Sequence, residues 1–395
     1  MPRQDLCFEP DHAILDVVRE LQAAPEPAIL SPARSRAAGI STYRVAGSAM
    51  TGFRVSPVGW PVMETRPMHG DGPTWALVLA AGEGSRLRSL TTTDAGTSIP
   101  KQFCSLRDGP SLVQEALVRA QMLTLPRNVC AIVAAQHERW WLPQLASLPA
   151  ANIFVQPLNR GTANGILLPL LLLLERDPGA RVVLLPSDHH VQDEAILARS
   201  MRKATEQLHR GADEVLLLGL EPDEADPQLG YIVPDHGGSQ GNLRVVQFVE
   251  KPTTMQARQL ISHGALWNTF IVASTARALL KLLLRSVPGI VKAMQTAVRQ
   301  DLQSHGKSRA VAQLYDRLPG VDFSRDILAE QFPFLRVLAV PPCGWSDLGT
   351  PERVERALHG FPRPAELDSM PGPQYLSLAA QQERLRANGL GQPGA

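Results

Sequence analysis

Cysteine is scarce in this chain of 395 residues. Its four cysteines lie far apart and form no Cys-x-x-Cys pair; they are Cys7, Cys104, Cys130 and Cys343. This pattern argues against a zinc site and against a disulfide framework, and it suits a reducing compartment. We therefore expect a cytoplasmic location.

The chain also lacks an excess of one charge and a long hydrophobic run. Lysine and arginine total 39 against 38 for aspartate and glutamate, a net charge of +1, so no general affinity for polyanions is indicated. The longest apolar run, Ile166–Leu174, contains Pro169 and is too short to cross a bilayer. The first residues lack the apolar core of a signal peptide. We expect neither nucleic acid nor a membrane among the partners.

Two glycines, by contrast, follow the first strand-like run at once. Leu77–Leu79 is apolar, and Gly82 and Gly84 come directly after it. Such glycines let successive backbone N–H groups turn inward and surround phosphate oxygens. Arg86 follows two residues later, and Lys101 lies across the loop. The amides and two cations predict a site for a polyanion, most simply a nucleoside triphosphate.

Two other phosphate-binding motifs fit this loop poorly. The P-loop pattern Gly-x-x-x-x-Gly-Lys-Ser/Thr is absent. The dinucleotide fingerprint needs a third glycine for close packing of helix on strand, and Leu87 stands at that place. A nicotinamide-dependent dehydrogenase is thus a disfavoured alternative, which an absorbance change with a nicotinamide cofactor would identify.

Further motifs follow the glycine loop in order along the chain. They are Pro157–Ala163, Leu185–His189, Gly230–Ile232, Phe248–Pro252, Leu266–Thr269 and Gly344–Gly349. Together with the loop, this series resembles the sugar-1-phosphate nucleotidyltransferases over roughly residues 75–358. The resemblance implies a Rossmann-like core whose reaction joins a nucleotidyl group to a sugar 1-phosphate and releases pyrophosphate.

Three motifs are similar to the mannose-1-phosphate guanylyltransferase branch of that family. They are Pro100–Phe103, Leu266–Asn268 and Gly344–Asp347, and they imply GTP and mannose 1-phosphate as substrates. Thr350 after Gly349 is instead similar to the glucose-1-phosphate branch. A glucose-1-phosphate uridylyl- or thymidylyltransferase therefore stays open as an alternative, as does a non-catalytic homologue that binds a sugar nucleotide.

The resemblance also implies roles for single residues. Asp188 and Asp347 would bind Mg²⁺, and with Arg86, Lys101 and Lys251 they form the implied catalytic set. The implied nucleotide-binding residues are Ala81, Gly82, Gly84, Ser85, Arg86, Lys101, Gln156, Gly161 and Thr162. Those implied for the sugar phosphate are Gly230, Glu250, Lys251 and Asn268.

The implied reaction depends on electrostatics and not on a general base. A phosphate monoester has a second pKa of about 6, so the attacking phosphate is largely dianionic at neutral pH. Two polyanions must meet, and positioning and charge neutralisation by Mg²⁺, Arg and Lys therefore carry the catalysis.

Asp188 follows the apolar run Val182–Leu185 and offers the hard oxygen ligand that Mg²⁺ prefers. An aspartate after a strand is otherwise a turn residue or a helix cap. Asp188–His190 also resembles the Asp-His-His phosphoesterases, but the further metal ligands of those enzymes are not found in the sequence. We assign no catalytic role to the two histidines.

Strand-like and helix-like runs alternate from Trp75 onward. This alternation predicts an α/β fold in which helices flank a mostly parallel sheet, with the ligand at the carboxyl ends of the strands. The expected strands are Ala76–Ala80, Val129–Ala134, Ile153–Gln156, Arg181–Leu185, Val215–Leu220, Val245–Val249, Phe270–Ala273 and Leu335–Val340. The expected helices are Ser111–Leu123, Glu194–Leu208, Met255–Ser262 and Ala276–Leu284.

Composition divides the chain into three segments. Residues 1–72 show one amphipathic run, Asp11–Leu21, and then sequence rich in Pro, Ala, Ser and Gly. We expect a low-order N-terminal extension there, or an over-long gene start. Residues 74–360 hold every motif and form the expected catalytic domain, and residues 361–395 are a tail rich in Pro, Gln and Gly. A homo-oligomer is compatible with this organisation.

Overall fold

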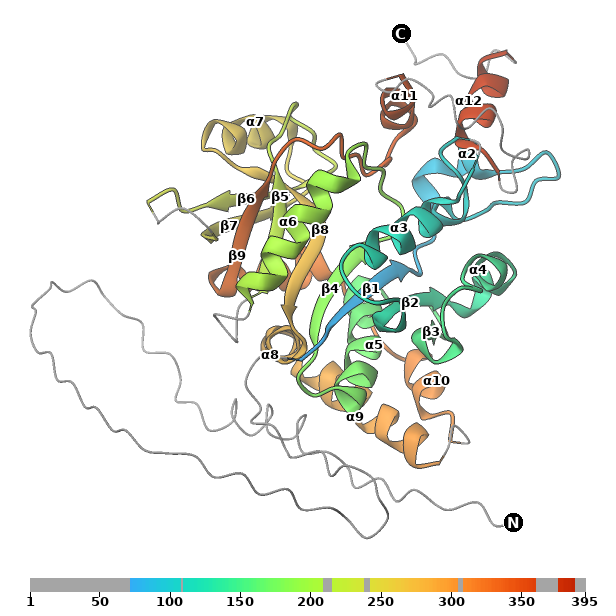
Figure 1. Cartoon of the computed structure of the whole chain (residues 1–395), viewed down its shortest axis with the longest axis vertical. Coiled ribbons are helices and arrows are strands. Elements are labelled where there is room, and N and C mark those ends of the chain that lie inside the picture. The colour runs from blue at the N-terminus through green and yellow to red at the C-terminus, as the bar shows by residue number, and fades with distance from the viewer. Residues whose placement is uncertain are drawn as a thin grey trace, which may run out of the picture.

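One mixed sheet of nine strands runs through the molecule (Figure 1). The computed structural model describes residues 72–107, 109–208, 215–237, 242–304, 308–359 and 376–387. The strand order is β3-β2-β1-β4-β8-β5-β9-β7-β6. The strands are β1 (Thr74–Ala80), β2 (Val129–Ala134), β3 (Ile153–Gln156), β4 (Arg181–Pro186), β5 (Val215–Leu220), β6 (Gly230–Pro234), β7 (Leu243–Glu250), β8 (Leu266–Thr275) and β9 (Leu335–Val340).

Seven of the nine strands point the same way. β3, β2, β1 and β4 are parallel neighbours, and so are β5 and β9. β8 lies antiparallel between β4 and β5, so those two share a direction, and β7 is antiparallel to both β9 and β6. Only β7 and β8 therefore run against the rest, which agrees with the mostly parallel sheet expected from the sequence.

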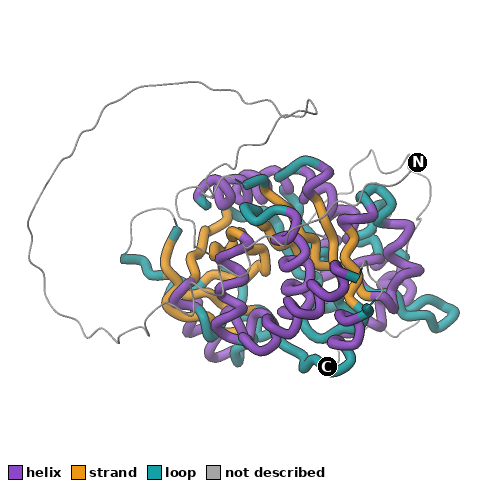
Figure 2. Tube along the Cα trace, turned by 90° about the horizontal axis from the view of Figure 1, so that it is seen from below, coloured by secondary structure: helices purple, strands orange, loops and turns teal. Residues whose placement is uncertain are grey.

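Helices cover both faces of this sheet (Figures 1 and 2). They include the short 3-10 helices η1 (Ser85–Leu87) and η2 (Lys101–Phe103) and the π-helix η6 (Phe323–Leu328). The α-helices are α2 (Arg88–Thr91), α3 (Leu112–Gln121), α4 (Glu138–Gln144), α5 (Thr162–Arg176), α6 (Glu194–Gln207), α7 (Thr254–Ser262), α8 (Ala276–Ser286), α9 (Pro288–Gln303), α10 (Ala310–Tyr315), α11 (Pro351–His359) and α12 (Leu378–Ala387).

Two large hydrophobic cores result, one on each face, and a third, smaller cluster includes Tyr231, Leu260 and Trp267. Successive side chains of a strand point to opposite faces. In β1, Leu77 packs into the core shared with α5, α8 and α9. Ala76, Val78 and Ala80 pack into the core shared with α3 and α6. The sheet therefore lies between two packed layers of helices, as in other three-layer α/β domains.

The predicted elements from Trp75 to α11 are present, with shifts at their ends. β6 was not predicted, and β8 is ten residues long where four were expected. The expected domain limits of 74 and 360 lie close to the start of β1 and the end of α11. None of the helices within the described ranges has the length and apolar character to span a membrane.

The predicted N- and C-terminal segments fall largely outside the described residues. Residues 1–71, including the amphipathic run Asp11–Leu21, are not described, nor are residues 361–375 and 388–395. The described part of the tail forms α12, which packs on the domain. Leu376 and Leu378 join Ser105 through backbone hydrogen bonds, and Arg384 pairs with Asp94.

Candidate active site

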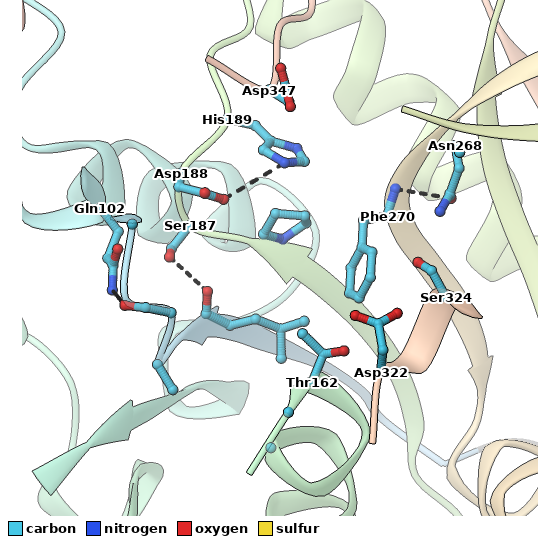
Figure 3. Close-up of a pocket in the computed structure, with 18 of the residues that line it drawn as sticks. Gln102, Thr162, Ser187, Asp188, His189, Asn268, Phe270, Asp322, Ser324 and Asp347 are labelled. Atoms are coloured by element: carbon cyan, nitrogen blue, oxygen red, sulfur yellow. Dashed lines mark hydrogen bonds and ion pairs between the residues drawn. The ribbon is translucent and has the colours of Figure 1, made fainter. Parts of the chain in front are cut away.

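A single cavity of about 420 Å³ gathers most of the residues singled out from the sequence (Figure 3). This volume is in the usual range for small-molecule sites. Thirteen of the fifteen predicted site residues line it: Ala81, Gly82, Gly84, Arg86, Gln156, Gly161, Thr162, Asp188, Gly230, Glu250, Lys251, Asn268 and Asp347. The other two, Ser85 and Lys101, are not among its lining residues.

The cavity lies where the topology predicts a ligand. β1, β3 and β4 end at this edge of the sheet. Gln156 is the last residue of β3, and Gly82 and Asp188 follow the ends of β1 and β4. β8 runs in the opposite direction, so its first residues, including Asn268, reach the same edge. Ligands of open α/β sheets bind at this edge.

The glycine loop turns sharply over the end of β1. Gly84 has a φ of 63°, and a Cβ at that position would lie 2.7 Å from the backbone nitrogen of Lys101. The turn is therefore open to glycine only. Gln102 fixes the loop from below, because its Nε2 donates to the carbonyls of Ala80 and Gly82 at 3.1 and 2.8 Å.

Arg86 reaches over the cavity from η1. Its side chain is 53% exposed, and its Nη2 lies 4.0 Å from Oδ2 of Asp347. Nη1 donates to Oε1 of Gln228 at 3.2 Å. The Arg86 guanidinium is hydrogen-bonded to Gln228 and still exposed to solvent, so it is well placed to bind a phosphate group.

Lys101 lies behind Asp188, buried to 4% exposure. Its Nζ is 2.9 Å from Oδ2 of Asp188 and donates to the carbonyl of Asp347 at 2.6 Å. Burial opposes ionisation of Asp188, but Lys101 and weaker contributions from His189 and Arg86 hold the pKa of that carboxyl below its ordinary value. The ammonium therefore keeps Asp188 charged and links it to the backbone of Asp347.

The carboxylate of Asp347 lies in the same cavity, and one of its oxygens is already occupied. Oδ1 accepts from the backbone nitrogen of Gly349 at 3.0 Å and from the guanidinium of Arg353. Burial raises the pKa of Asp347, an effect that Lys101, the Gly349 N–H and Arg86 partly offset. Oδ2 is the oxygen that lies nearer to Arg86.

The two histidines after Asp188 stay neutral. Burial lowers the pKa of His189 to about 3 and that of His190 to about 4. The ring of His189 packs edge-on against Trp345 at 5.2 Å between centroids. His189 lines the cavity, whereas His190 is not among its lining residues.

Residues of β6, β7 and β8 form the opposite wall. Gly230 pairs with Glu250 in the β6–β7 ladder, so the loop after β7 reaches the cavity. Lys251 extends beside them with its Nζ 3.2 Å from Oε1 of Glu250 and a side chain 55% exposed. Burial raises the pKa of Glu250, and Lys251 acts against that rise.

A bulge in β8 turns Asn268 toward the cavity. The register against β5 shifts between Leu217 and Gly219. Phe270 takes a φ of 60° at this point, and its backbone N–H donates to Oδ1 of Asn268 at 3.1 Å. Lys251 and Leu348 also have positive φ. Non-glycine residues in this region are costly, and they gather at functional sites.

Several lining residues were missed from the sequence. They include Gln102, Asn159, Gln228, Phe270, Asp322 and Ser324. Gln102 belongs to the Pro100–Phe103 motif, from which only Lys101 was predicted as a site residue. Gln228 lies two residues before Gly230. Asp322 and Ser324 come from a segment without any recognised motif, and only the fold brings them to this cavity.

Comparisons with known proteins find a family model and several similar proteins. A family model described as nucleotidyl transferase matches residues 75–360. The alginate biosynthesis protein AlgA of Pseudomonas syringae pv. tomato is 27% identical over 280 residues, covering 69% of this chain and 56% of that protein. Mannose-1-phosphate guanylyltransferase RfbM of Salmonella typhimurium is 31% identical over 229 residues, covering 56% of this chain and 46% of that protein. The chain thus spans about half the length of these curated relatives.

A solved structure from Thermus thermophilus, described as mannose-1-phosphate geranyltransferase, superimposes with a TM-score of 0.62 at 26% identity. The match covers 74% of this chain and 81% of the other. The fold of this chain agrees with that structure, and the family match extends over well more than half of the residues. The chain belongs to the nucleotidyl transferase family.

Proposed function

We propose that this protein transfers a GMP group from GTP to mannose 1-phosphate and forms GDP-mannose and pyrophosphate. The observation that carries the proposal is the convergence of motif residues far apart in the sequence on one cavity. The choice of substrates is supported by relatives named mannose-1-phosphate guanylyltransferase in Salmonella typhimurium and Escherichia coli O157:H7. The scattered cysteines support a cytoplasmic location for this reaction.

The proposed step is a direct displacement at phosphorus. A phosphate oxygen of the sugar 1-phosphate forms a bond to the α-phosphorus of GTP, and the bond from that phosphorus to the bridging oxygen breaks. Pyrophosphate leaves with the electron pair, so no proton has to move. Neutral His189 and His190 are not needed. Positioning and charge stabilisation supply the rate enhancement.

The cations at the site bind or stabilise different phosphate groups. Arg86 and the amides of the glycine loop hold the triphosphate, and Lys251 on the other wall holds the sugar phosphate. Lys101 contributes its charge from behind Asp188, where it is already bound to that carboxylate. The direct contact of Lys101 with the triphosphate that the sequence led us to expect stays a prediction, because Lys101 is not among the residues that line the cavity.

Asp188 and Asp347 fit a magnesium ion. Both carboxylates line the cavity, and Lys101 holds Asp188 in its ionised form. Within the described ranges no group of three or more His, Cys, Asp or Glu side chains could hold a metal. Two carboxylates completed by phosphate oxygens and water are what Mg²⁺ accepts, unlike zinc. The ion, when bound, would neutralise charge on the phosphates.

A screen for pyrophosphate release tests the proposal directly. The full chain is assayed with GTP, ATP, CTP, UTP and dTTP against mannose, glucose and N-acetylglucosamine 1-phosphates, with Mg²⁺ and with EDTA. We expect GTP with mannose 1-phosphate to be the best pair and EDTA to abolish release. If UTP or dTTP with glucose 1-phosphate turns over about tenfold faster than GTP with mannose 1-phosphate, the protein belongs to the glucose-1-phosphate branch. No release with any pair would support the non-catalytic homologue.

A further inference from the structure

One wall of the cavity comes from residues 315–324, a segment that joins α10 to η6. Hydrogen bonds fasten it to the nucleotide side of the site. The backbone nitrogen of Phe323 donates to Oγ1 of Thr162 at 2.7 Å, and that of Ala163 donates to the carbonyl of Val321 at 3.1 Å. The wall therefore has a fixed place relative to the start of α5.

Gly161 and Arg160 extend this attachment. Gly161 has a φ of 85°, and a Cβ there would lie 2.3 Å from the carbonyl oxygen of Val321. The Nε and Nη2 of Arg160 donate to the carbonyls of Tyr315 and Asp316 at 2.8 and 2.9 Å. The expected nucleotide loop and the 315–324 segment thus meet backbone to backbone, with no room between them for a larger residue.

Asp322 points from this wall into the cavity (Figure 3). It is the N-cap of η6, and its Oδ1 accepts from the backbone nitrogen of Arg325 at 2.9 Å. Among the described residues, none is seen to donate to its Oδ2. The cap fixes the carboxylate group, so its second oxygen is presented at a defined place in the cavity.

The surroundings of Asp322 indicate that the neutral, hydroxyl-rich part of a ligand binds there. The negative charge of Asp322 acts on Glu250, whose pKa is raised mainly by burial and further by Asp322. Two carboxylates that face one cavity repel phosphates and accept hydrogen bonds from hydroxyl groups. Lys251 next to Glu250 offers the place for the phosphate of the same ligand. A sugar 1-phosphate presents this combination.

We propose that Asp322 accepts hydrogen bonds from hydroxyl groups of the sugar and is a specificity-determining residue of the site. The inference rests on the proposed function. Glu250 and Asp322 hold the sugar between opposite walls, one from the β7 loop and one from the start of η6. Because the second wall is fastened to Thr162, the sugar is positioned relative to the nucleotide.

Asp322→Asn tests this role without removing the cap, because the asparagine side-chain oxygen also caps a helix. The substitution removes the charge and one acceptor. We expect the KM for mannose 1-phosphate to rise roughly 10- to 100-fold, the effect of losing a charged hydrogen bond, with the KM for GTP unchanged. The preference for mannose 1-phosphate over glucose 1-phosphate should fall. Asp322→Ser, a shorter residue that also caps, should act in the same direction.

Asp316→Asn is the matched control. Asp316 lies in the same segment and is exposed, and only its backbone carbonyl takes part in the contact with Arg160. This variant should keep both KM values. A rise of the GTP KM alone in Asp322→Asn would place the residue at the nucleotide and overturn the proposal, and so would unchanged KM values for both substrates.

A binding measurement separates this inference from the proposed function. Calorimetry compares GDP-mannose with GDP on the full chain, without turnover. In the unmodified protein GDP-mannose should bind more tightly, and the Asp322→Asn variant should lose about tenfold or more of that difference while its affinity for GDP is kept. Equal loss for both ligands, or no gain from the sugar in the unmodified protein, contradicts the inference even if the protein proves to be silent.

Discussion

Lys101 and Asp188 show how much a single buried pair contributes to this site. An ammonium that is 4% exposed must be fully bonded, and here a carboxylate and two carbonyls take that role. The pair fixes one of the two carboxylates that fit a metal. Asp188 also has a structural role beside its proposed one at the metal, because removing its charge leaves Lys101 without its anionic partner.

Replacing either carboxylate by asparagine should remove turnover. Asp188→Asn and Asp347→Asn keep the side-chain size but lose a negative oxygen, and no general base exists to compensate. We expect pyrophosphate release to fall by roughly two to four orders of magnitude, as for other preorganised electrostatic groups, at saturating Mg²⁺. Circular dichroism should show a folded protein.

Asp193→Asn is the control for this pair of variants. Asp193 caps α6 by accepting from Ile196, and asparagine caps equally well. It lies close to Asp188 in the sequence and should keep normal activity. Near-normal turnover of both Asp188→Asn and Asp347→Asn would rule out the metal assignment.

At the level of single residues, the sequence motifs predicted most of the residues that line the cavity and missed others that the fold brings there. Gly82, Asp188 and Lys251 were found because each is part of a local pattern. The buried position of Lys101 was not foreseen, since sequence does not show which face of a loop its side chain takes. Asp322 has no local signal, because its neighbour Phe323 brings it to the cavity through a backbone hydrogen bond to Thr162, 161 positions earlier in the chain.

The element that follows the last motif, α11, sets the place of Asp347. Arg353 on its buried side contacts the carboxylates of both Asp347 and Asp226. Burial lowers the pKa of Arg353 to about 10, so the guanidinium is still charged at neutral pH. The helix thereby joins the Gly344–Gly349 motif to the loop before β6.

Arg353→Met should be strongly destabilising. The change leaves two buried carboxylates without their cation, which costs roughly 3–5 kcal/mol of the free energy of unfolding. Arg356→Met, three residues along the same helix, removes only a surface pair with Glu224 and should cost less than about 1 kcal/mol. Urea unfolding of the two variants measures the difference. Equal losses of the free energy of unfolding would show that the buried network stabilises the fold no more than the surface pair does.

Elements whose pattern is local were predicted, and elements decided by packing were not. The capping box of α3 and the apolar run of β5 were readable in the sequence. α5 was seen only as an apolar run that contains Pro169, because a helix buried on most sides loses the polar face that reveals helical periodicity. β8 was predicted too short, since the bulge at Phe270 and the polar Asn268 break the alternation of a strand.

On the scale of the whole molecule, the site joins two parts of the sheet. One side of the cavity, where we propose that the nucleotide binds, comes from β1, β2, β3 and β4, and the other, where we propose that the sugar phosphate binds, from β6, β7 and β8. Alternating elements predicted helices on a mostly parallel sheet. The insertion of β8 between β4 and β5 is not visible in the sequence, because the order of strands depends on pairing between distant segments.

A ligand that touches both parts should stabilise the entire domain. With GDP-mannose at about 100 times its Kd, mass action adds about 2.7 kcal/mol to the free energy of unfolding. For a domain of this size each kcal/mol raises Tm by roughly 2–4 °C, so a rise of several degrees is expected in a thermal scan. UDP-glucose at the same concentration serves as the control. A larger rise with UDP-glucose would argue against guanine and mannose as the preferred groups.

The attachment of α12 has a consequence for how the protein is made. This helix contacts α2 and α11, and its first residues bond to Ser105 and Leu106, close to the glycine loop and η2. All of these partners precede it in the chain, and synthesis proceeds from the N-terminus. On the ribosome, α12 can therefore dock near the glycine loop only after every strand of the sheet has been translated.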